Sequence, residues 1–63
     1  MEIKAGNVVK LKGSDIHMTV EIVYEAHLEK SDIKANVARL LWFVGDVLNS
    51  AIVSVDALEK VSD

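Results

Sequence analysis

The sequence contains no cysteine, and its only histidines are His17 and His27. Disulfides are therefore excluded. Neither histidine stands beside a tight group of carboxylates, so we expect no metal site and no cofactor. A small domain with a weak core usually depends on a disulfide, a metal or a partner subunit. Of these three supports, the partner subunit is the one that the composition leaves open.

Long hydrophobic runs are also missing. No stretch approaches the roughly 18 apolar residues that a membrane-spanning helix needs. The first residues do not have the pattern of a signal peptide, because Glu2 and Lys4 flank the single apolar Ile3. We therefore expect a cytoplasmic protein without a membrane segment.

Catalytic motifs are absent as well. The three glycines, Gly6, Gly13 and Gly45, are isolated and form no phosphate-binding loop. The serines show no nucleophile elbow, and the aspartates fall in turn-like segments, where Asp usually shapes the backbone. A chain of 63 residues also leaves little room for a pocket. We predict no catalytic residue and no enzymatic activity.

The length fits one domain, residues 1–63, with a single small core. Hydrophobic residues make up 51% of the chain, which is more than so small a domain easily buries. A two-fold homodimer would cover the excess by pairing the same patch on both copies. The alternative is that single apolar residues are scattered over the surface, as in many monomers.

Charge is distributed unevenly along the chain, whose net charge is −3. Lys4, Lys10 and Lys12 lie near the N-terminus, and together with Arg39 they would be the phosphate contacts of a nucleic-acid-binding barrel. Three lysines make a thin basic face, and lysines also protect strand edges. The acidic balance therefore disfavours nucleic acid as the partner.

The first half of the chain has the pattern of two strands. Residues 5–14 contain a turn, a β-branched run and a second turn, which predicts the first strand. Residues 17–23 alternate, which predicts a half-buried second strand. This alternation assigns side chains to two faces: Met18, Val20 and Ile22 on one, Thr19 and Glu21 on the other. Residues 24–36 are polar, and we expect a variable connection there.

The middle of the chain allows two interpretations. As a strand, residues 37–44 would direct Ala38, Leu40 and Trp42 inward. The apolar residues also recur at helical spacing, which favours an α+β fold with a helix at about 31–48. Gly45 and Asp46 weaken such a helix and suit a hairpin tip. Periodicity alone leaves both interpretations open.

The last third predicts a strand, a turn of helix and a second strand. Residues 47–53 have strand composition. Residues 54–58 predict one helical turn, which a serine or an aspartate can cap. Residues 58–61 predict a short final strand.

The order of these features resembles the YodC-like family of small bacterial proteins, whose function is not established. The resembling segments are residues 6–14, 18–20, 42–46, 49–51 and 56–61. The resemblance implies an all-β fold, a small five-stranded SH3-like barrel with one helical turn before the last strand, and it implies no activity. Leu40 stands where the family has a cysteine, so a thiol-based role is excluded here.

The three aromatic residues are the candidate partner-binding residues. Trp42 and Phe43 are adjacent, so on a strand they point to opposite faces and only one can enter the core. The other would anchor a partner or a second copy, since aromatic residues are enriched at interfaces. Tyr24 is a further candidate at the start of the variable connection.

These observations predict a non-enzymatic SH3-like module that mediates protein–protein interaction or self-association. The alternative is a nucleic-acid-binding small β-barrel that uses the N-terminal lysines. A subunit or regulator of an enzyme encoded elsewhere is a third hypothesis.

Overall fold

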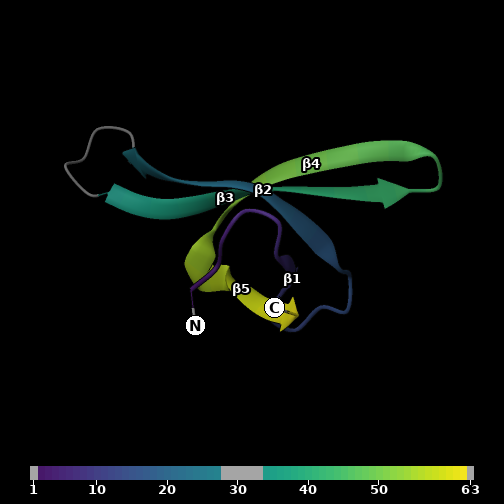
Figure 1. Cartoon of the computed structure of the whole chain (residues 1–63), viewed down its shortest axis with the longest axis horizontal. Coiled ribbons are helices and arrows are strands. Elements are labelled where there is room, and N and C mark those ends of the chain that lie inside the picture. Colours follow the sequence, from purple (N-terminus) through teal and green to yellow (C-terminus); the bar gives the residue numbers. More distant parts are fainter. Residues whose placement is uncertain (1, 28–33, 63) are drawn as a thin grey trace.

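The computed structural model describes residues 2–27 and 34–62, and over these residues the chain is built almost entirely of β-strands (Figure 1). The elements are β1 (Val8–Leu11), β2 (Met18–His27), β3 (Lys34–Val44), β4 (Val47–Ser54), the 3-10 helix η1 (Val55–Ala57) and β5 (Leu58–Ser62). The all-β prediction is confirmed. The helical alternative over 31–48 is wrong for residues 34–48, which lie in β3, a turn and β4. Residues 31–33 of that range lie outside the described residues.

The five strands form one antiparallel sheet in the order β4-β3-β2-β1-β5. In Figure 1, β3 and β4 cross the upper part of the molecule, β1 and β5 lie below them, and β2 passes from one layer to the other. This strand order, with η1 before the last strand, is that of an SH3-like barrel. The fold that the resemblance implies is therefore the fold observed.

Two local signals form as the sequence predicts. Gly45 and Asp46 connect β3 to β4. Gly45 has φ +60°, and a positive φ is what the first central residue of a tight hairpin turn requires. Ser54 is the N-cap of η1, where its side-chain oxygen accepts a hydrogen bond from the backbone N–H of Asp56 at 3.3 Å. Both features can be predicted from the sequence because the backbone conformation at each of them depends only on the adjacent residues.

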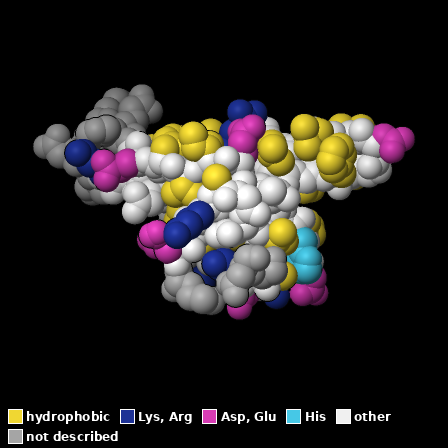
Figure 2. All heavy atoms as spheres, in the orientation of Figure 1, with side chains coloured by type: hydrophobic (Ala, Val, Ile, Leu, Met, Phe, Trp, Pro, Cys, Tyr) yellow, Lys and Arg dark blue, Asp and Glu magenta, His cyan; other side chains and the backbone are white. Residues whose placement is uncertain are grey.

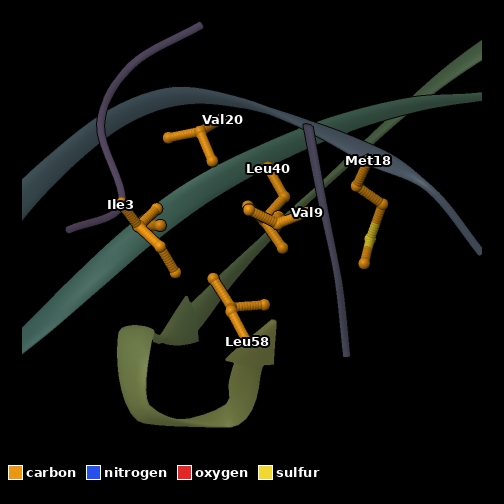
Figure 3. Close-up of a cluster of buried hydrophobic side chains, with 7 residues drawn as sticks. Ile3, Val9, Met18, Val20, Leu40 and Leu58 are labelled. Carbon is orange, nitrogen blue, oxygen red and sulfur yellow. The ribbon is translucent and has the colours of Figure 1, made fainter. Parts of the chain in front are cut away.

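The core lies between the two layers and is small (Figure 3). Its buried residues are Ile3, Val9, Met18, Val20, Ala38, Leu40 and Leu58. Figure 3 shows Leu40 and Val9 close together at its centre, with Leu58 beneath them. Ala38 and Leu40 point inward as predicted, and Trp42 packs against the cluster while remaining half-buried. No buried polar side chain is found in the part of the chain that the structure describes.

The predicted face of Ile22 is wrong. The pairing of β2 with β3 matches Val20 with Leu40 and Ile22 with Arg39, so the register shifts at Glu21. Such a bulge adds one residue to one strand, and every later side chain then changes face. Val20 is buried, whereas Ile22 is turned outward and is 48% exposed. Alternation in the sequence carries no sign of this shift.

The predicted connection over 24–36 is wrong for residues 24–27 and 34–36, which are strand, and its residues 28–33 lie outside the described residues. Strand β2 continues to His27 and β3 begins at Lys34, and Glu25 pairs with Asn36 along this extension. The two strands also carry an ion pair, Lys34 Nζ to Glu25 Oε1, at 3.7 Å. Pairing in this extension rests on backbone hydrogen bonds between the two strands, which do not depend on the type of side chain. The polar composition of the segment therefore does not mark the end of either strand.

Among the described residues there is no helix of the length and apolar character needed to cross a bilayer.

Replacing Leu40 with Ala should destabilise the fold severely. Leu40 is fully buried, and truncating a buried leucine costs about 2–5 kcal/mol, which approaches the whole stability of so small a domain. The matched control is Phe43→Ala on the same strand, where the side chain is exposed and the cost should stay within about 0.5 kcal/mol. Urea titration followed by far-UV circular dichroism measures both, and equal losses would contradict the assigned inward face.

Candidate protein-interaction surface

The side of the β2–β3–β4 sheet that faces away from the core is called here the outer face. The strand register sets its side chains in rows: Tyr24 beside Val37, Ile22 beside Arg39 and Ile52, Leu41 beside Ser50, and Phe43 beside Leu48. Because directly opposite side chains share a face, each row forms a contiguous strip across the sheet. The outer face is therefore lined mainly by large apolar groups.

These apolar groups are exposed to solvent. The exposed fractions are 69% for Phe43, 60% for Ile52, 55% for Leu48, 48% for Ile22 and 39% for Tyr24. Figure 2 shows hydrophobic side chains along the upper side of the molecule, over the layer that contains β3 and β4. Single exposed apolar residues are ordinary, but a continuous group of them marks an interaction surface.

A charged pair stands in the middle of the outer face. Arg39 Nη1 lies 3.2 Å from Glu21 Oε1, and both side chains remain about half exposed. The bulge at Glu21 places this carboxylate beside the row of Ile22 and Arg39. An exposed pair of this kind contributes only about 0–1 kcal/mol to stability. Its main effect is to give an apolar face one polar, directional contact point.

Two shallow depressions mark this region. Ile22, Tyr24, Arg39 and Ile52 are among the residues that line the first, which extends over β2, β3 and β4. The second lies beside the β3–β4 turn, and its lining includes Trp42, Phe43 and Leu48. Both depressions are open, so they suit the flat contact of a protein surface better than an enclosed small molecule.

The hairpin tip, residues 43–48, is apolar on both of its faces. Phe43 and Leu48 lie on the outer face, while Val44 and Val47 pair with each other on the opposite face and are equally exposed. In Figure 1 the β3–β4 hairpin extends beyond the β1–β5 layer, so no other strand covers its inner face. The tip is therefore the most accessible apolar element among the described residues.

The predicted partner-binding residues are only partly brought together. Trp42 and Phe43 point to opposite faces as expected, with Trp42 against the core and Phe43 exposed, and both line the second depression. Tyr24 shares the outer face with Phe43 but lies toward the other end of the sheet. Their contact with a partner stays a prediction.

The sequence-based prediction missed Ile22, Leu48 and Ile52. Ile22 had no signal, because the bulge that turns it outward leaves no mark in the alternation. For the other two a signal existed: the two-residue turn at Gly45 and Asp46 sets the register, which puts Leu48 opposite Phe43 and Ile52 opposite Arg39.

The four basic candidates do not form one patch. Lys10 Nζ pairs with Glu59 Oε2 at 3.8 Å on the β1–β5 ladder, and Arg39 pairs with Glu21 on the outer face of β3. Lys12 lies in the turn after β1, and Lys4 precedes β1. A polyanion needs several cations on one path, and here two of the four already face carboxylates.

Within residues 2–27 and 34–62, no group of three His, Asp or Glu side chains has an arrangement that could hold a metal ion. Neither a protein-family model, nor a curated protein, nor a solved structure matches the chain. The resemblance to the YodC-like family therefore stays a prediction, and the outer face and hairpin tip are the features from which a function can be argued.

We expect weak retention on heparin. The basic side chains are dispersed and partly paired with acids, so few counterions would be released on binding. The protein should elute below about 0.2 M salt in a heparin-affinity gradient, a range where proteins with many phosphate contacts remain bound. Elution well above that concentration would support the nucleic-acid alternative.

Proposed function

We propose that this chain is a non-enzymatic, cytoplasmic protein-interaction domain that binds its partner through the outer face and the hairpin tip. The observation that carries the proposal is the row arrangement of Ile22, Tyr24, Phe43, Leu48 and Ile52, all exposed on one side of one sheet. A monomer that needed no partner would gain by placing polar residues there.

The size of this surface fits such a role. With on the order of 200 Å² for a fully exposed large side chain, the exposed fractions correspond to roughly 500 Å² of apolar-residue surface. The largest apolar patch of an ordinary monomer is about 300–600 Å² and is often functional, and a standard interface covers about 800 Å² per partner. The apolar rows, together with the polar residues beside them, therefore approach the area that one partner contributes to a standard interface.

The chemistry of the surface also favours a protein partner. Aromatic residues and arginine are enriched at protein interfaces, and here Phe43, Tyr24 and Arg39 share one face. The Arg39–Glu21 pair offers one donor group and one acceptor group at the centre. A partner with an apolar contact strip and a complementary polar group fits this arrangement.

Replacing Phe43 with Ser should reduce capture of a partner at least about ten-fold, because exposed aromatic anchors often contribute 1.4 kcal/mol or more to binding. The immobilised protein is exposed to lysate of its native cell, and the bound proteins are quantified by mass spectrometry. The matched control is Ile16→Ser, since Ile16 is 59% exposed but lies in the connection between β1 and β2, off the outer face.

Circular dichroism should show that both variants remain folded. Equal capture by wild type and Phe43→Ser, or equal losses in the two variants, would count against the outer face as the contact surface.

A further inference from the structure

The two edges of the sheet differ in how they are protected. Strand β5 is short, and Glu59 and Lys60 place charges on it, which is a common way to prevent edge-to-edge pairing. Strand β4, at the other edge, is eight residues long and contains no charged residue and no proline. A long uncharged edge strand is a template for pairing with another chain. The edge of β4 therefore requires an explanation that the edge of β5 does not.

The backbone of β4 has hydrogen-bonding groups available for such pairing. In the described part of the chain, β3 is the only strand beside β4. Val44 and Val47 close a two-residue turn and so form a hydrogen-bonded pair. Because such pairs alternate along an antiparallel ladder, Leu48, Ser50 and Ile52 direct their amide and carbonyl groups away from β3.

The large apolar side chains of β4 are arranged symmetrically about Ser50. From Val47 to Val53 the sequence reads Val-Leu-Asn-Ser-Ala-Ile-Val, so Val47 mirrors Val53 and Leu48 mirrors Ile52, and only the small central pair, Asn49 and Ala51, differs in type. When two copies of this strand pair antiparallel around Ser50, Leu48 of each copy lies opposite Ile52 of the other. Val47 likewise lies opposite Val53, and Asn49 opposite Ala51.

This register is consistent with the faces of the sheet. Antiparallel partners lie on the same face, and Leu48 and Ile52 both belong to the outer face, whereas Val47 and Val53 both belong to the other face. Val47 is 64% exposed. In this register it gains an apolar neighbour from the second copy. Asp46, the charged residue next to the strand, comes opposite Ser54 rather than another acid, so the pairing brings no like charges together.

We propose that the partner of β4 is a second copy of this chain, and that the two copies form a two-fold dimer by antiparallel β4–β4 pairing centred on Ser50. The inference rests on the proposed function and deepens it, because it names one partner of the exposed sheet. The two outer faces join into one continuous surface across the dimer. The hairpin tip of each copy covers the far end of the other copy's β4.

Analytical ultracentrifugation of the full chain tests the assembly. Wild type should be dimeric in the micromolar range. Ser50→Pro should be monomeric, because proline removes an N–H directed away from β3 without removing a bond of the β3–β4 ladder. Ser50→Thr is the matched control and should remain dimeric, since threonine keeps the N–H and favours strands. A wild-type chain that stays monomeric to millimolar concentration, or a Ser50→Pro variant that dimerises as tightly as wild type, would overturn the inference.

A single introduced thiol tests the register, and the absence of natural cysteine makes it specific. Ser50→Cys brings the two thiols together at the two-fold axis, within the Cα separation that a disulfide allows. At about 10 μM protein it should form a covalent dimer about a hundred-fold faster than a chain whose thiols do not meet, because pairing raises the effective thiol concentration to about the millimolar range.

The control is Thr19→Cys, since Thr19 is exposed on the outer face but lies on β2, two strands from the edge. Equal cross-linking of the two variants would reject the β4 pairing even if wild type is dimeric or Ser50→Pro fails to fold. Such a result would leave the Phe43→Ser capture experiment intact, so the inference and the proposed function can fail separately.

Discussion

A β-strand sends alternate side chains to opposite faces, so one additional residue reverses the orientation of every residue after it. In β2 this additional residue is Glu21. Before it, Met18 and Val20 enter the core; after it, Ile22 and Tyr24 join the outer face. The shift also sets Glu21 beside Arg39. The part of the apolar rows that β2 contributes, and the Glu21 side of the polar centre, both depend on this one bulge.

The sequence predicts those parts of the fold that local chemistry decides. The turn at Gly45 and the cap at Ser54 each depend on a few adjacent residues, and the inward face of Ala38 and Leu40 follows from alternation in an unbroken strand. Alternation could not decide between strand and helix for 37–44, because the apolar residues there fit both periods; the pairing of β3 with strands on both sides decides it. Non-local pairing also determines two features that the sequence-based prediction missed. These are the bulge at Glu21 and the extension of the β2–β3 ladder to His27 and Lys34.

The distribution of apolar residues explains why the surface matters as much as the core. Only seven of the described residues form the buried cluster, and the largest of them that are fully buried are Leu40, Val9 and Val20. Every aromatic side chain stays at least partly exposed. Within the part of the chain that the structure describes, the fold therefore leaves several large hydrophobic groups, Phe43 and Tyr24 among them, where they contribute little to its own stability. Contact with another chain would convert that exposed area into stabilisation of both partners.

The β1–β5 ladder has a consequence for how the chain folds. It pairs Val9 with Lys60, residues roughly fifty positions apart, so its closure carries a large loop entropy cost. The β3–β4 hairpin needs only a two-residue turn and closes at little cost. The sequence has no proline, so slow isomerisation of a prolyl bond cannot limit the rate. The speed of folding is then set by topology, because β1 and β5, two short strands from opposite ends of the chain, must meet and pair.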